Sequence, residues 1–190
     1  MKSLPIYRIQ LGDSAGIKIM SLVEYPAVET DFLKFSEEQP LQFSINEEER
    51  IVFGVALRAD FPIYRISPHL GEYYVVFDKQ TIKELYEKFL IEGRVSEVNL
   101  EHDVRTGGVH LIQSFIKDSN KGINPVGFED IADGSWFTAY KVLNDEVWDR
   151  VKNGEFRGFS VEGFFELEKE QFSEQKENEV EDLINELITK

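Results

Sequence analysis

Histidine and serine are the side chains of this chain most suited to hydrolytic chemistry. The chain has only three histidines, His69, His102 and His110, and histidine is the side chain that most readily gains and loses a proton near neutral pH. His69 follows a proline in a predicted loop, where we expect it to be exposed. His102 ends a predicted strand in the stretch NLEHD, and functional residues favour such positions. A histidine at a strand end is nevertheless more often structural, so His102 alone is only a candidate base.

One serine lies between two glycines in the stretch GFSVEG, which runs from Gly158 to Gly163. A serine hydroxyl is a poor nucleophile unless a base lies beside it. The stretch is not the nucleophile elbow of the α/β-hydrolases, because the second glycine comes one residue late and the order is helix then strand. The local sequence favours a small residue at a crowded strand crossing, with a nucleophilic role for Ser160 as the alternative.

A metal site is a third kind of chemistry to consider around His102. Glu101, Asp103 and His110 would add oxygen and nitrogen donors on one predicted hairpin. Alternation sends neighbouring strand residues to opposite faces, and the spaced ligand motifs of zinc and calcium sites are missing from the sequence. With no cysteine, the chain also has no thiolate ligands. We therefore expect neither a metal nor a cofactor.

The composition limits the classes of partner. The chain has 190 residues, 42% of them hydrophobic, which suits one globular core. Its formal charge of −15 argues against binding to nucleic acid or to an anionic membrane surface. No apolar run approaches the roughly 20 residues that span a bilayer. The first residues do not resemble a secretory leader, so we expect a cytoplasmic type of compartment.

Helical periodicity appears in two central segments and in the tail. Asp78 is a predicted N-cap, followed by apolar residues at helical spacing up to Gly93. Asn144 is predicted to cap a short helix that ends at Gly154. Branched and aromatic runs predict the strands, over residues 6–11, 17–23, 51–57, 72–77, 95–102, 109–116, 135–143 and 157–167.

Two strand pairings are expected. Strands 51–57 and 72–77 should be neighbours in one sheet, and strands 95–102 and 109–116 should form a β-hairpin. That hairpin would place His102 opposite Leu111 and Asp103 opposite His110. Helices inserted singly among many strands predict an α+β fold. We expect a partly closed, mostly antiparallel β-barrel or curved sheet with flanking helices.

Three parts are expected along the chain. Residues 1–50 form N-terminal strands and an irregular arm, residues 51–168 form the core, and residues 169–190 form an acidic helical tail. The last 25 residues, 166–190, carry nine acidic residues against three lysines. Like charges at that density keep a segment extended or helical.

Three stretches together resemble a known family. They are VNLEHD with the return GVHLIQSFI, then DEVWDRVKNGEFRGFSVEGFF, and GIKIMSLVEYPAVETDFLKF near the start. In order and spacing they resemble the capsid maturation (prohead) serine proteases of tailed bacteriophages, a group similar to the herpesvirus assemblins in fold and active site. The resemblance extends over roughly residues 16–165.

The resemblance implies roles for individual residues. In this family the catalytic histidine precedes the serine, which matches His102 as general base and Ser160 as nucleophile. Related proteases add a histidine or carboxylate that orients the base. Glu162 is preferred here, because it lies two residues after Ser160 and so shares its strand face. Asp103 and His110 remain alternatives.

The resemblance also implies a function. Family members cleave scaffolding protein and extensions of the major capsid protein during procapsid maturation, usually ending in self-cleavage. This chain would then be a serine endopeptidase in the procapsid or virion interior, within the host cell cytoplasm. It would have no nucleic acid or membrane partner, and a homo-oligomer is an open expectation. The alternative is a catalytically inactive capsid or scaffold assembly protein with the same fold.

Overall fold

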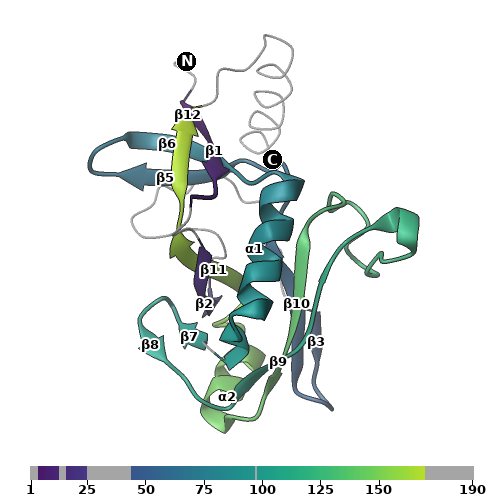
Figure 1. Ribbon diagram of the computed structural model, residues 1–190. Coiled ribbons are helices and arrows are strands. Elements are labelled where there is room, and N and C mark those ends of the chain that lie inside the picture. Colours follow the sequence, from purple (N-terminus) through teal and green to yellow (C-terminus); the bar gives the residue numbers. More distant parts are fainter. Residues whose placement is uncertain (1–3, 13–15, 25–43, 97, 170–190) are drawn as a thin grey trace.

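The computed structural model describes residues 4–12, 16–24, 44–96 and 98–169 (Figure 1). Residues 25–43, which include most of the arm predicted over residues 29–50, and the acidic tail from residue 170 onward lie outside the described residues. The described part is mostly β, with two α-helices, which agrees with the predicted α+β class. Its sheets do not close into the barrel that was one form of the prediction. No helix within the described part is long and apolar enough to cross a membrane.

The strands of the described residues form three sheets of four strands each. Sheet A has the order β12 (Glu166–Lys169), β1 (Ile6–Gln10), β6 (Gly71–Val76) and β5 (Ile63–Ser67). Sheet B has the order β11 (Gly158–Phe164), β2 (Gly16–Val23), β7 (Val98–Leu100) and β8 (Val104–Arg105). Sheet C has the order β3 (Ser44–Asn46), β4 (Ile51–Leu57), β10 (Trp136–Val142) and β9 (Val109–Ile116). The pairs β1–β6 and β2–β7 are parallel, and the other pairs are antiparallel.

Both central helices begin at the predicted caps. Helix α1 (Lys79–Ile91) starts where the Asp78 side chain accepts a 2.7 Å hydrogen bond from the Thr81 amide. Helix α2 (Asp145–Lys152) starts where the Asn144 side chain accepts from the Val147 amide at 3.1 Å. Each cap satisfies an amide that has no partner inside its helix. Two short 3₁₀ turns, η1 (Arg94–Ser96) and η2 (Ser119–Lys121), complete the elements.

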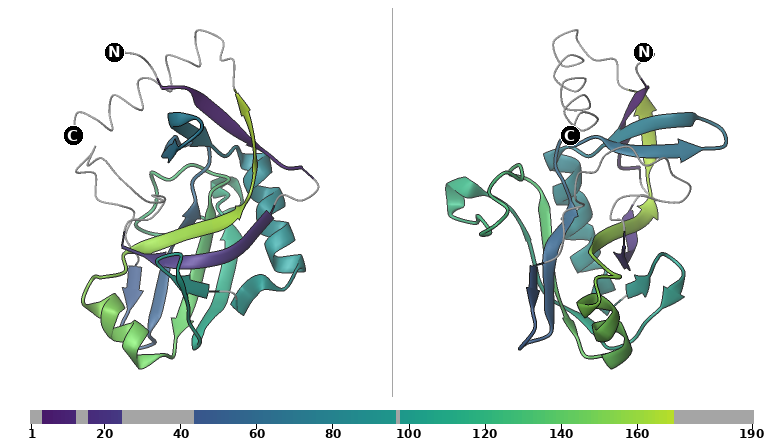
Figure 2. Two further views of the ribbon diagram at one scale, coloured as in Figure 1. Left: turned by 90° about the vertical axis from the view of Figure 1, so that its left-hand side faces the viewer. Right: turned by 180° about the vertical axis from the view of Figure 1, so that it is seen from behind.

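The core forms where α1 and sheet B pack against sheet C. Helix α1 contacts both β2 and β10, and the Phe89 ring packs edge-on against Trp136 with ring centroids 5.3 Å apart. In the left view of Figure 2, β2 and β11 lie across the strands of sheet C. There the Phe159 ring contacts Tyr140 at 5.3 Å. The first pair joins α1 to sheet C and the second joins sheet B to sheet C, and each buries a large apolar area.

Two predicted pairings are wrong. Strand β4 belongs to sheet C and β6 to sheet A, so they are not neighbours. Strand β9 pairs with β10, placing His110 opposite Lys141, while β7 pairs in parallel with β2 and forms its hairpin with the short β8. The turn that contains His102 therefore connects β7 to β8, two neighbouring strands of sheet B. Local turn signals cannot reveal this, because burial in the whole fold decides which apolar strands pair.

Strands from different predicted parts of the chain pair within the same sheets. Strands β1 and β2, from the predicted N-terminal part, pair with β6 and β7 from the predicted core. The last described strand, β12, pairs with β1, and Leu167 lies opposite Ile9. The boundaries at residues 50 and 168 stay predictions.

Lys117 has a buried ammonium group that anchors the loop between β9 and β10. Its side chain is 1% exposed, and Nζ donates to the carbonyl oxygens of Phe128, Glu129 and Ile131 at 2.9, 3.0 and 2.5 Å. A buried charge is tolerated when hydrogen bonds replace its water. Lys117 therefore fixes a loop whose own residues form little regular structure.

We expect Lys117→Met to destabilise the fold by about 3 kcal/mol, because three inward-facing carbonyl groups lose their donor. Urea unfolding followed by circular dichroism measures this. Lys121→Met, four residues along on an exposed ion pair with Asp118, is the matched control and should change little. Equal stability of the two variants would contradict the anchoring role.

Candidate active site

A row of polar residues crosses sheet B. Ser160 on β11 lies opposite Ser21 on β2, and Ser21 lies opposite Asn99 on β7. Paired residues of neighbouring strands project to the same face. The three side chains are buried, at 2%, 0% and 3% exposure. Buried polar groups need hydrogen-bond partners. Three such groups side by side in an otherwise apolar sheet therefore indicate a candidate functional site.

His102 reaches this face through a tight turn after β7. Glu101 and His102 both have left-handed backbones, with φ of 50° and 59°, and the Asp103 amide closes the turn on the Leu100 carbonyl at 3.1 Å. The Glu101 amide also donates to the Leu22 carbonyl at 3.0 Å. Left-handed conformations cost non-glycine residues free energy, and such strain clusters at functional sites. Because His102 lies in this turn, the alternation of side chains along β7 does not determine the direction of its side chain.

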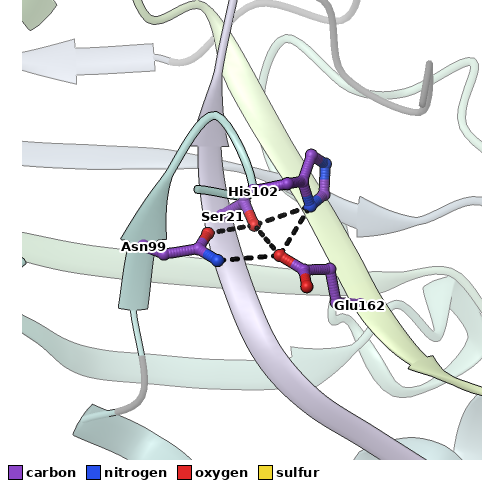
Figure 3. Close-up of polar contacts among 4 residues, drawn as sticks. All are labelled: Ser21, Asn99, His102 and Glu162. Atoms are coloured by element: carbon purple, nitrogen blue, oxygen red, sulfur yellow. Dashed lines mark hydrogen bonds and ion pairs between the residues drawn. The ribbon is translucent and has the colours of Figure 1, made fainter. Parts of the chain in front are cut away.

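Glu162 meets His102 directly, as Figure 3 shows. The Glu162 Oε1 atom lies 2.7 Å from the His102 Nδ1 atom. The same oxygen accepts from the Asn99 amide nitrogen at 2.8 Å and from the Ser21 hydroxyl at 3.1 Å. Ser21 Oγ lies 3.0 Å from His102 Nδ1, and Asn99 Oδ1 is the alternative acceptor for its single hydroxyl proton. Three residues from two strands and a turn thus converge on one carboxylate oxygen of Glu162.

The charge state of Glu162 follows from these contacts. Partial burial acts to raise the pKa of its carboxyl group, but hydrogen bonds from Asn99, His102 and Ser21 outweigh it, and the pKa is lowered. Donors that contact a carboxylate favour its ionised form. Glu162 therefore carries a negative charge at neutral pH, directed at the imidazole ring.

The two ring nitrogens of His102 have different surroundings. Nδ1 faces the Glu162 carboxylate, an acceptor, so Nδ1 carries the ring proton. Nε2 is buried and has no hydrogen-bond partner among the described residues. Neutral imidazole with its proton on Nδ1 presents a lone pair at Nε2. The arrangement leaves Nε2 able to accept a proton.

The proposed nucleophile Ser160 lies beside this cluster without joining it. Within the described residues no hydrogen bond links Ser160 to His102; the serine bonded to the ring is Ser21. Ser160 and Ser21 are direct cross-strand neighbours, so their Cα atoms are separated by about 5 Å. Catalytic hydrogen bonds in sites without substrate are often long and shorten only on binding.

The alternative third residues lie elsewhere. Asp103 is exposed beyond the turn, and neither it nor His110, exposed on β9 of sheet C, contacts the cluster. His69 is exposed as expected. Of the candidates for orienting His102, the structure brings only Glu162 against the ring.

Sequence reasoning missed Ser21 and Asn99. Their only local signal is a small polar residue inside each apolar strand, in the stretches IKIMSLV and VNL. Joining them to His102 and Glu162 requires the register of β2 with β7 and β11, which single strands do not specify.

Gly163 explains the second glycine of the GFSVEG stretch. A Cβ atom there would lie 2.3 Å from the Gly16 carbonyl oxygen, so only glycine lets the β11 and β2 backbones approach so closely. The pairing register shifts between Glu162 and Gly163, as at a β-bulge. Bulges re-aim side chains, and this one lies next to the carboxylate that contacts His102.

A serine, a histidine and a carboxylate on adjoining elements are the side-chain types of a serine hydrolase site. Comparison with protein families gives the particular assignment. The chain belongs to the family described as "Putative phage serine protease XkdF", whose model matches residues 41–169. That match includes His102, Ser160 and Glu162.

Two curated relatives come from Bacillus subtilis (strain 168). The phage-like element PBSX protein XkdF is 25% identical over 167 residues, covering 83% of this chain and 56% of the relative. The uncharacterized protein YqbD is 27% identical over 167 residues, covering 83% of this chain and 48% of the relative. The chain thus spans about half the length of these relatives. No solved structure matches it.

Ionisation of Glu162 makes stability depend on pH. Because its folded-state pKa is lowered, its contribution is complete above the ordinary glutamate pKa and is lost as pH falls through the folded-state value. The difference in unfolding free energy between the parent chain and Glu162→Gln should therefore shrink between about pH 5 and pH 3. Urea unfolding across this range measures it. A difference that stays constant with pH would refute the ionised contact, and the exposed Glu48→Gln is the control.

Proposed function

We propose that this chain is a serine endopeptidase of the capsid maturation type, with Ser160 as nucleophile, His102 as general base and Glu162 as the residue that orients His102. Its substrates are the scaffolding protein and the extensions of the major capsid protein inside the procapsid, in the host cell cytoplasm, and self-cleavage ends its activity. The proposal adds a specific reaction to the family membership. It also includes the expected similarity of fold and active site to the herpesvirus assemblins.

The observation that carries the proposal is the asymmetry of the His102 ring. Glu162 accepts from Nδ1 at 2.7 Å, while Nε2 is buried and has no partner in the described part of the chain. A general base in a serine protease has this arrangement, with the carboxylate on one nitrogen and the nucleophile facing the other. Ser160, buried two residues before Glu162 on β11, is the neighbouring serine outside the Glu162 contacts.

The same asymmetry argues against Ser21 as the nucleophile. Ser21 contacts Nδ1, the nitrogen that already carries the proton directed at Glu162. One nitrogen cannot donate to the carboxylate and at the same time accept the serine proton. Ser21 therefore supports the ring, and its hydroxyl proton goes to Glu162 or Asn99.

The reaction proceeds by acyl transfer. As Ser160 Oγ bonds to the peptide carbonyl carbon, its proton moves to Nε2 of His102, and Glu162 stabilises the resulting imidazolium. The C–N bond then breaks, and the Nε2 proton passes to the leaving amine. Water attacks the acyl-enzyme with His102 again as base, which releases the new carboxyl terminus and restores the Ser160 hydroxyl.

We expect Ser160→Ala to abolish trimming when the chain is co-expressed with the scaffolding and major capsid proteins of its phage. The parent chain should shorten both proteins, visible by gel and by intact mass. Loss of a triad nucleophile costs at least about a thousandfold in rate. Ser21→Ala, one strand away, is the matched control and should retain trimming within about tenfold.

Other outcomes would reject the proposal. Trimming by Ser160→Ala equal to that by the parent would remove Ser160 from the reaction. Trimming lost in Ser21→Ala and kept in Ser160→Ala would reverse the roles of the two serines. Full-length substrates with the parent chain itself would favour the inactive assembly protein.

A further inference from the structure

Asn99 uses both ends of its side-chain amide within the site. Its Nδ2 atom donates to Glu162 Oε1 at 2.8 Å, and its Oδ1 atom accepts from the Ser21 hydroxyl. The residue is 3% exposed in the middle of β7, directly opposite Ser21. Because its two ends meet a carboxylate and a hydroxyl, the orientation of this amide is informative.

Ser21 determines which way the Asn99 amide faces. If the amide were turned over, Oδ1 would face the Glu162 carboxylate and two acceptors would repel each other. The Ser21 hydroxyl stabilises the observed orientation of the Asn99 amide, because it donates to Oδ1. The NH₂ group is then held against Oε1, the oxygen that also contacts His102.

The Glu162 carboxylate needs such support. Its side chain is 27% exposed, so one route for the carboxylate leads away from His102 toward solvent. Partial burial also acts to raise its pKa and favours the neutral acid, which the Asn99 hydrogen bond opposes most strongly. Without Asn99, fewer hydrogen bonds would oppose the effect of burial on the Glu162 pKa, and the carboxylate would lose its fixed direction.

We propose that Asn99 is a positioning residue, which keeps the Glu162 carboxylate ionised and directed at Nδ1 of His102, with Ser21 setting the orientation of the amide. For its effect on cleavage the inference rests on the function proposed above. Its electrostatic part concerns only Glu162 and is measurable in the chain without a substrate.

The test is the titration of the Glu162 carboxyl carbon by ¹³C NMR in the full chain. In Asn99→Ala the Glu162 pKa should rise by about one unit, because a hydrogen bond to a charged group is lost while burial stays. The exposed Asn124→Ala is the matched control and should leave the titration unchanged. An Asn99→Ala chain with the parent's Glu162 titration would overturn the inference.

Asn99→Asp provides a second test if the alanine variant fails to fold. It keeps the shape of asparagine but sets a carboxyl group against Glu162, so the two groups should share a proton and one should titrate well above the usual range. Both carboxyl groups titrating at ordinary values would show that residue 99 does not hold Glu162, and would overturn the inference equally.

Cleavage assays separate this inference from the proposed function. If the parent chain cleaves its substrates, Asn99→Ala should lower kcat by about tenfold with KM little changed, because the Glu162 carboxylate is then less firmly directed at His102. A shifted Glu162 titration in a chain without activity would keep the positioning role and reject the protease function. An unshifted titration in an active chain would reject the positioning role alone.

Discussion

The hydrogen bond between the Glu162 carboxylate and the His102 ring is the interaction on which the site depends. It joins β11 to the turn after β7, two segments that are 60 residues apart in sequence. A partly buried carboxylate is stable only with donors, and Asn99 and His102 both supply one to the same oxygen. The left-handed turn that carries His102 costs backbone free energy, and this contact helps to offset it.

Much of the fold follows from local sequence. Asp78 and Asn144 cap the two helices as predicted, because a side-chain acceptor at a helix start satisfies an amide whatever the surroundings. The runs predicted as β4, β6, β9 and β10 are strands, although β5 was missed. Their partners could not be predicted: β9 pairs with β10 and not with β7. The pattern along one strand indicates which of its faces is buried, but it does not indicate which other strand is its partner.

The site, like the fold, has features that local sequence predicts and features that depend on strand pairing. Glu162 was expected near the histidine from its two-residue spacing to Ser160, and the structure brings it against the ring. Ser21 and Asn99 could not be found this way, since each is one polar residue in an apolar strand and gains meaning only when β2 lies between β7 and β11. The role of Ser160 stays a prediction, supported by the family assignment and by the Nε2 atom of His102, which no described residue contacts by a hydrogen bond. The structure adds a choice between two adjacent serines that the sequence did not raise.

Labelling with a fluorophosphonate tests most directly whether Ser160 is the activated serine. Such reagents bond to the oxygen of a serine whose proton a neighbouring base removes, and fluoride leaves. Trypsin separates the two candidates, because residues 158–169 contain Ser160 as their only serine and residues 19–34 contain only Ser21. The account predicts a phosphonyl adduct on peptide 158–169 that disappears in His102→Ala. An adduct on peptide 19–34, or equal labelling with and without His102, would contradict it.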